Sequence, residues 1–454
     1  MKQNIALVDA AVISQSSNHW IGTPPRINVE NDDGMDKSGS TPSNVKISNA
    51  VMDWVGSLSL EVDEETSLNS YQKDKFYVPM YKRPHQDIVN EKYQFYKGLF
   101  ESYLQSNPHV IKKERVTSHT IEVVEDDNHE KNKKRKIIPI TIFWPSEYNQ
   151  TILNMERVCV HCHGGGWLFG DSKYQVGERM LHMSSVLQIP VLSIEYRMVP
   201  NHPYPDPVDD IQHVLEWLLL TKTSASYSFT TATTTRKTLN HLENVRENRK
   251  IVASGESAGA HLLLLAMIRL MKSQPQLFVK EKILALNLVY GVYDLSGTES
   301  LKNDNDKSAP LSGNELQWMM DMHVPPSWKP HPKHSDISPL YFFDLSIKNN
   351  NIQQQVAINL SLPPTLFTVG TADPLLEDTV RMACHYNSFQ NDIYYFTKNN
   401  STNNSKESTE VELAIYAGGQ HGIGHFGTQQ NISLGNNARE YTEQFLFQHL
   451  NKIN

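Results

Sequence analysis

The strongest chemical signal in this sequence is a serine between two glycines. The hexapeptide GESAGA, residues 255–260, places Ser257 between Gly255 and Gly259, after a strand-like apolar run and before a helix-like one. A sharp strand-to-helix turn has no room for side chains at the flanking positions, and it exposes the serine hydroxyl at a helix N-terminus. The pattern therefore predicts that Ser257 is a nucleophile. A serine that caps a helix in a glycine-rich turn is the alternative that this segment alone leaves open.

A second glycine-rich segment, HGGGW, lies upstream at residues 163–167. Consecutive glycines allow backbone N–H groups to approach a ligand closely, as binding the oxyanion of an acyl-transfer reaction requires. We expect Gly164 and Gly165 to donate two such N–H groups, and Ala258 at the start of the following helix to donate a third. A flexible glycine turn would not explain why this segment follows a strand and precedes a nucleophile turn.

A nucleophilic serine needs a base that takes its proton, and the base needs a carboxylate that orients it. Asp373 is the acid candidate, because it lies in the loop TADPLLED after a late strand; Glu377 and Asp378 are alternatives that would start the next helix. His421 is the base candidate, in the glycine-rich loop AGGQHGIGHF after the last strand. His425, farther from that strand, is the alternative.

A sheet must bring these residues together. Strand-like and helix-like runs alternate along the chain, which predicts an α/β fold with a mostly parallel central sheet and helices on both faces. We expect strands at residues 120–124, 137–144, 157–161, 191–196, 251–255, 283–289, 365–370 and 411–416. We expect helices at residues 178–186, 209–220 and 258–270. The first two strands, separated by a charged tip, are predicted to form an antiparallel hairpin.

Composition divides the chain into three parts. Residues 1–50 are rich in polar and turn-forming residues, which predicts a disordered tail. Residues 51–115 carry aromatic and aliphatic residues at helical spacing, which predicts a helical cap segment. Residues 116–454 are then the catalytic domain, although a division of the chain into two domains fits its length equally well.

Insertions interrupt the catalytic domain. One, at residues 297–338, would extend the cap; its apolar residues either line an adaptable wall for an acyl chain or pack the cap onto the core. These apolar residues are Leu316, Trp318, Met319, Met320 and Met322. Three polar low-complexity stretches are predicted to be loops, at residues 221–249, 348–355 and 398–409.

Charge and cysteine content restrict the partners and the compartment. The formal net charge of −8, from 42 basic and 50 acidic residues, argues against a general nucleic-acid binder. Three cysteines favour a reducing compartment, so we expect a cytoplasmic protein, without a secretory signal or a transmembrane segment. Residues 159–163, CVHCH, contain metal-ligand types, but strand alternation would send neighbouring side chains to opposite faces, so no metal site is expected.

Together these segments resemble the hormone-sensitive-lipase-like group of α/β-hydrolases, which includes arylacetamide deacetylases and many microbial esterases. The resemblance runs from about residue 115 to residue 450, in HGGGW (163–167), EYRMVPNHPYPDPVDD (195–210), GESAGAHLLLLA (255–266), DPLLED (373–378) and HG (421–422). The positions that match the group's nucleophile, acid and base are Ser257, Asp373 and His421. Those that match its oxyanion hole are Gly164, Gly165 and Ala258.

The resemblance implies a capped esterase that hydrolyses short- to medium-chain acyl esters without a metal or organic cofactor. Its substrate would be a small-molecule or lipid ester, and the sequence does not decide between a monomer and a homo-oligomer. Glu256 stands where members often have Asp or Thr, Ala417 where they have Pro, and Ile423 where they have Phe. These departures put substrate preference in doubt. An amidase or deacetylase of small acylated amines, and a non-catalytic ligand-binding protein, remain alternatives; related plant hormone receptors lack the histidine, which this chain has as His421.

Overall fold

The computed structural model describes residues 4–8, 10–16, 18–30, 44–61, 78–112, 114–125, 134–146, 156–220, 225–231, 249–279, 282–304, 311–344, 362–400, 410–424 and 432–452. Its strands are β1 (Asn4–Val8), β2 (Ala11–Ser16), β3 (His19–Thr23), β4 (Arg26–Glu30), β5 (Val116–Glu125), β6 (Lys134–Phe143), β7 (Arg157–Cys162), β8 (Val191–Ile194), β9 (Ala225–Thr231), β10 (Lys250–Glu256), β11 (Ile283–Val289), β12 (Thr365–Gly370) and β13 (Val411–Tyr416). Its helices are α1 (Asn44–Ser57), the short 3-10 helix η1 (Met80–Lys82), α3 (His85–Ser106), α4 (Pro108–Lys112), α5 (Gly177–Leu187), α6 (Asp206–Leu219), α8 (Ala258–Ser273), α9 (Gln276–Val279), α10 (Glu299–Asp304), α11 (Gly313–His323), α12 (Leu340–Phe343), α14 (Leu376–Asn400) and α15 (Ile432–Asn451).

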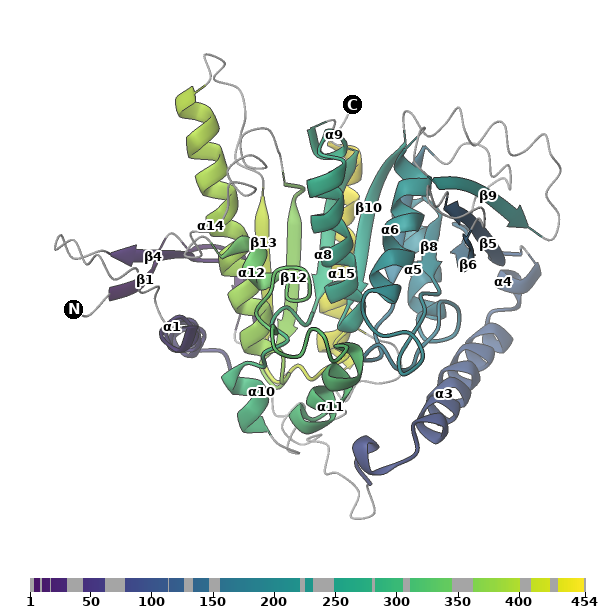
Figure 1. Cartoon of the computed structure of the whole chain (residues 1–454), viewed down its shortest axis with the longest axis horizontal. Helices are drawn as coiled ribbons and strands as arrows, with labels where there is room; N and C mark the ends of the chain where they lie inside the picture. Colours follow the sequence, from purple (N-terminus) through teal and green to yellow (C-terminus); the bar gives the residue numbers. More distant parts are fainter. Residues whose placement is uncertain are drawn as a thin grey trace.

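One large sheet runs through the molecule (Figure 1). Within the described residues it has 11 strands in the order β2-β3-β13-β12-β11-β10-β7-β8-β6-β5-β9. From β13 to β8 the neighbouring strands are parallel, and antiparallel pairs extend the sheet at both ends. β1 and β4 form a separate antiparallel pair.

Helices cover both faces of the parallel part, as such a sheet requires. α8 packs on β10 and on α6, whereas α15 packs on β11 and on α5. Figure 1 shows α6 and α8 in front of the sheet and α15 behind it. Every residue of β11, β12 and β13 is buried, which explains why these strands are mostly apolar and have the predicted bounds. The predicted α/β fold with a mostly parallel central sheet is confirmed.

The N-terminal region differs from the predicted tail. β3 pairs with β13 at the edge of the parallel sheet, β2 pairs with β3, and Trp20 and Ile21 are buried there. α1 begins at Asn44, also inside the range predicted to be a tail. Short edge strands need few buried side chains, so a composition averaged over fifty residues conceals them.

One predicted loop also contains regular structure. β9 lies within the Ser/Thr-rich stretch 221–249 and pairs antiparallel with β5. Threonine and aromatic residues favour strands, and this strand occupies the sheet edge, where polar side chains are tolerated. α14 continues to Asn400, into the stretch 398–409 predicted to be a loop. The stretch 348–355, and the parts of the other two at residues 221–224, 232–248 and 401–409, lie outside the described residues.

Two separate segments meet above the C-terminal ends of the parallel strands. In the first, η1 and α3 belong to the range predicted as the cap segment, and α3 packs on α5. In the second, the insertion at 297–338 contains α10 and α11. The two are joined where the backbone N–H of Met80 in η1 donates to the buried carboxylate of Glu315 in α11, at 3.0 Å. Within the part of the chain that the structure describes, no helix combines the length and apolar character needed to cross a bilayer.

Candidate active site

Ser257 occupies the turn between β10 and α8 in a conformation that few non-glycine residues adopt. Its backbone angles are φ 53° and ψ −123°. Its N–H donates to the carbonyl of Val289 in β11 at 2.9 Å, which fixes the turn against the neighbouring strand. A Cβ at Gly259 would collide with the carbonyl oxygen of Cys162, and one at Gly255 would lie 2.8 Å from the carbonyl oxygen of Gly259. Close packing around the turn therefore requires both glycines.

The structure brings Ser257, Asp373 and His421 together. His421 Nε2 lies 3.0 Å from Ser257 Oγ, and His421 Nδ1 lies 3.0 and 3.1 Å from the two carboxylate oxygens of Asp373. The serine follows β10, the aspartate follows β12 and the histidine follows β13. These strands belong to the parallel part of the sheet, so their C-terminal ends share one edge. The arrangement can pass a proton from a hydroxyl to an imidazole that a carboxylate orients.

Asp373 is fixed by its own loop. Its side chain is fully buried, and one of its oxygens also accepts the N–H of Leu375 at 2.8 Å. The N–H of Leu376 donates to the carbonyl of Asp373 at 3.0 Å, so the turn into α14 starts at the aspartate itself. The carboxylate is thus held toward His421 before any ligand binds.

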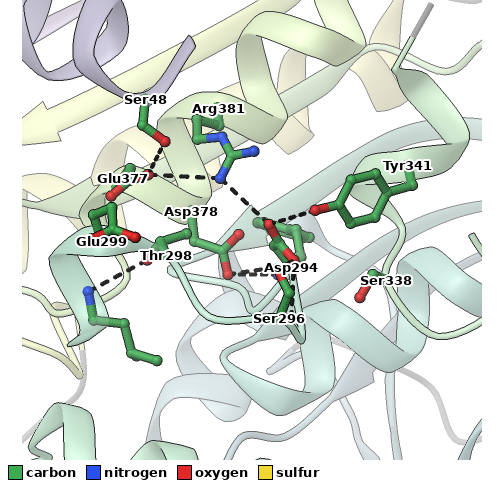
Figure 2. Close-up of polar contacts among 12 residues, drawn as sticks. Ser48, Asp294, Ser296, Thr298, Glu299, Ser338, Tyr341, Glu377, Asp378 and Arg381 are labelled. Carbon is green, nitrogen blue, oxygen red and sulfur yellow. Dashed lines mark hydrogen bonds and ion pairs between the residues drawn. The ribbon is translucent and has the colours of Figure 1, made fainter. Parts of the chain in front are cut away.

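The two alternative carboxylates bind other groups (Figure 2). Glu377 accepts hydrogen bonds from the hydroxyl of Ser48 at 2.5 Å and from the N–H of Ser300 at 2.8 Å. Asp378 accepts the N–H of Tyr293 at 2.8 Å, and burial raises the pKa of its carboxyl well above the ordinary value. Both residues tie α14 to neighbouring segments and do not bind His421. His425, the alternative base, lies outside the described residues.

The HGGGW loop lies directly beside the serine. A Cβ at Gly164 would be 3.3 Å from the Cβ of Ser257. Gly165 has φ +107°, and its carbonyl accepts the N–H groups of Leu168 and Phe169, which folds the loop back on itself. Among the described residues, the N–H groups of Gly164, Gly165 and Ala258 have no hydrogen-bond partner. These three N–H groups are therefore available to bind an anion next to Ser257.

A buried ion pair lies next to the serine turn and the HGGGW loop. Arg179 of α5 pairs with Glu256, which precedes Ser257, and both side chains are almost fully buried. The Cγ of Glu256 would lie 3.5 Å from a Cβ at Gly164, so the pair contacts the glycine loop as well. The sequence distinguished Glu256 only as a departure from the related group, and no motif pointed to Arg179. Tyr290, whose ring lies beside His421, was also missed.

The insertion at residues 297–338 packs directly against the HGGGW loop. A Cβ at Gly166 would collide with the sulfur of Met319, and the ring of His323 stacks on Trp167 with centroids 4.5 Å apart. The side chains of Leu316, Met319 and Met320 are fully buried, as packing of the insertion onto the core requires. Trp318 and Met322 are only partly buried.

The cysteine and histidine side chains of residues 159–163 contact different parts of the molecule. Cys159 Sγ lies 3.8 Å from Met183 Sδ in α5, whereas the ring of His163 stacks on Tyr196 with centroids 4.3 Å apart. Tyr196 also donates its hydroxyl to the carbonyl of His163 at 2.7 Å, which anchors the start of the glycine loop. Among the described residues, no group of three or more His, Cys, Asp or Glu side chains is arranged to hold a metal ion.

Comparison with known proteins shows a family and several relatives. The sequence profile of a family described as alpha/beta hydrolase fold matches residues 159–401. An esterase of Acinetobacter venetianus is 29% identical over 226 residues, which is 50% of this chain and 59% of that protein. Arylacetamide deacetylase of Rattus norvegicus is 25% identical over 150 residues, which is 33% of this chain and 32% of that protein. The chain thus spans less than two thirds of the length of either relative.

A solved structure is similar over more of the chain. The crystal structure of vibralactone cyclase superposes with a TM-score of 0.58 at 16% sequence identity. The match covers 86% of this chain and 96% of that one. At this level of identity the likeness concerns the fold alone.

Proposed function

Because the chain belongs to the alpha/beta hydrolase fold family, we propose that it is a serine hydrolase that cleaves carboxylic esters. One observation carries this proposal: His421 hydrogen-bonds to the hydroxyl of Ser257 through one ring nitrogen and to Asp373 through the other. The similarity to an esterase of Acinetobacter venetianus supports the same class of reaction.

The mechanism is a two-step acyl transfer. His421 Nε2 takes the proton of Ser257 as Oγ bonds to the ester carbonyl carbon, and Asp373 holds the imidazole in the required tautomer. The protonated imidazole then gives its proton to the leaving alcohol as the carbon–oxygen bond breaks, leaving an acyl group on Ser257. The same imidazole then takes a proton from water as the water attacks the acyl carbon. It returns that proton to Ser257 Oγ as the bond between Oγ and the acyl carbon breaks, which releases the acid and the free serine.

The developing oxyanion is bound by the N–H groups of Gly164, Gly165 and Ala258. Their lack of another partner within the described residues and the position of Gly164 against Ser257 support this assignment. Donors that are already oriented stabilise a transition state without reorganising, and one such donor contributes about 10²- to 10³-fold in rate.

The cap favours esters of short- to medium-chain acids, as small molecules or lipids. α11 packs directly on the glycine loop, with Met319 against Gly166 and His323 against Trp167. These side chains of α11 occupy space beside the loop, which supports an acyl group of limited length. Trp318 and Met322 of α11 are only partly buried, and we propose that they contact the acyl group.

A panel of p-nitrophenyl esters that differ only in acyl length tests the proposal. We expect kcat/KM to peak at a short or medium chain and to fall for long chains, with no turnover above background by Ser257→Ala. Equal turnover by Ser257→Ala would contradict the mechanism. A preference for long chains would contradict only the assignment of substrate size.

The similarity to arylacetamide deacetylase favours amides of small acylated amines as a second candidate substrate class. Turnover of a nitrophenyl ester and of the anilide of the same acid separates the two. A kcat/KM for the anilide comparable to that for the ester would support a deacetylase, because an amine is the poorer leaving group.

A further inference from the structure

Tyr290, the first residue after β11, is held in a strained conformation between the nucleophile and the acid loop. Its φ is 36°, in a region where non-glycine residues are uncommon and which costs energy. Its N–H donates to the carbonyl of Thr368 in β12 at 2.7 Å, and the preceding carbonyl, of Val289, accepts the N–H of Ser257 at 2.9 Å. Hydrogen bonds to both neighbouring strands thus maintain this conformation. Strained residues that the surroundings hold in place concentrate at functional sites.

The side chain of Tyr290 lies beside His421. The two ring centroids are 4.7 Å apart and the ring planes are inclined by 56°. Tyr290 is only 1% exposed, so water does not separate or screen the two rings. A cation over the face of an aromatic ring and within about 6 Å of its centroid is attracted by the ring quadrupole, more strongly when both groups are desolvated.

The phenol of Tyr290 stays neutral where imidazoles titrate. Burial, and the negative charges of Glu256 and Asp373, raise the pKa of Tyr290 well above its ordinary value, against the opposing effect of Arg179. Tyr96, whose own pKa is also raised by burial, is the other titratable group beside it. The ring beside His421 is therefore an uncharged π system.

The hydroxyl of Tyr290 makes no contact that would explain why a tyrosine occupies this position. It is buried, and within the described part of the chain it has no hydrogen-bond partner. An unpaired buried hydroxyl is unfavourable. The aromatic ring, rather than the hydroxyl, is then the part of the side chain that serves the site.

We propose that Tyr290 is a positioning residue whose ring stabilises the protonated imidazole of His421 while the serine proton is held there. This rests on the proposed function, in which His421 becomes an imidazolium in both steps. Replacing the phenol by benzene should preserve the effect, and weakening the ring quadrupole without changing its shape should remove it.

The test compares the full-length protein with Tyr290→Phe and with Tyr290→3,4,5-trifluorophenylalanine. Histidines labelled with ¹³C at Cε1 report the titration of His421, whose signal is assigned by its loss in His421→Gln. We expect Tyr290→Phe to match the wild type. We expect the trifluorophenylalanine variant to titrate at lower pH and to lose about two- to fivefold in kcat/KM at unchanged KM, the size of one such contact.

Tyr293 provides the matched control. It is buried three residues further along, and its ring packs on Phe367 with centroids 6.1 Å apart. The same fluorinated residue at position 293 should leave the titration of His421 and kcat/KM unchanged. A melting curve for each variant establishes that it is folded.

An unchanged titration of His421 in the fluorinated Tyr290 variant would overturn the inference, as would an equal change from Tyr290→Phe. A wild type that does not hydrolyse esters would instead contradict the proposed function. The NMR titration would still decide the role of Tyr290 in that case, because it requires no turnover.

Discussion

His421 Nε2 and Ser257 Oγ lie 3.0 Å apart although 164 positions of sequence separate the two residues. The distance follows from topology, because β10 and β13 are parallel strands whose C-terminal ends lie at the same edge of the sheet. Each of the two residues is also fixed by a further hydrogen bond. The turn at Ser257 is fixed by Val289, and His421 is also bound by Asp373.

Replacing His421 should abolish turnover while leaving the fold intact. In His421→Ala the serine has no base, and loss of a catalytic histidine lowers kcat by about 10⁴- to 10⁶-fold. Steady-state hydrolysis of a nitrophenyl ester measures this, with circular dichroism to verify folding. A loss of less than tenfold would indicate that another group, such as His425, acts as the base.

The choice between the carboxylates is testable with two isosteric variants. Asp373→Asn should lower kcat by about 10⁴-fold, because the amide favours the wrong imidazole tautomer. Glu377→Gln is the control: it weakens the bonds to Ser48 and Ser300 and should lower the melting temperature with little change in kcat. Kinetics in which Glu377→Gln loses more activity than Asp373→Asn would reverse the assignment.

A single methyl group tests the oxyanion loop. Gly164→Ala places a Cβ 3.2 Å from the carbonyl oxygen of Glu256 and 3.3 Å from the Cβ of Ser257, so the loop must shift. We expect kcat to fall by about 10²-fold, close to the loss of one donor, with a smaller change in KM. Gly98→Ala on α3, where nothing lies within 4 Å of the new methyl, should keep full activity and stabilise the protein by about 0.5–1 kcal/mol.

The two buried histidines beside Trp167, His261 and His323, predict a loss of stability in acid. Burial lowers the pKa of His261 to about 4, and burial and His261 together lower that of His323 well below its ordinary value. Histidine in the unfolded chain protonates near pH 6.5. The contribution of these neutral rings to the free energy of unfolding is therefore fully present above pH 6.5 and is lost as pH falls toward 4. At about 1.4 kcal/mol per pKa unit, His261 alone contributes roughly 3 kcal/mol.

Melting temperatures between pH 7.5 and 4.5 measure this effect. His323→Phe retains a ring that can stack on Trp167 but cannot be protonated, so its melting temperature should fall less steeply with acid. His109→Gln, at an exposed position on α4, should follow the wild type. Equal slopes for all three proteins would show that the buried rings do not control acid stability.

The sequence predicted those elements whose residue pattern directly reflects their burial in the fold. β11, β12 and β13 are buried on both faces, so their apolar runs have the bounds of the strands themselves. The glycines of the two loops were recognisable because close backbone packing leaves no alternative residue. The N-terminal strands were missed, since β2 and β3 lie at a sheet edge where only a few side chains, such as Trp20, are buried.

The residues that surround Ser257, Asp373 and His421 could not be predicted in this way. Arg179 lies on α5 and reaches Glu256 only because the two elements pack together, so no spacing in the sequence links them. Tyr290 is one of 19 tyrosines, and nothing in its local sequence indicates a ring beside His421. Such contacts arise from the packing of distant elements.

The most direct test of the central claim is covalent labelling by a fluorophosphonate, which reacts with serines activated by a neighbouring base. The account predicts one label per chain, located by peptide mass spectrometry on Ser257, and none in Ser257→Ala or in heat-denatured protein. Slow or absent labelling of His421→Ala, which keeps the serine, would show that activation depends on the imidazole. A folded wild-type protein that takes no label, or takes it on another serine, would contradict the assignment of Ser257 as the nucleophile.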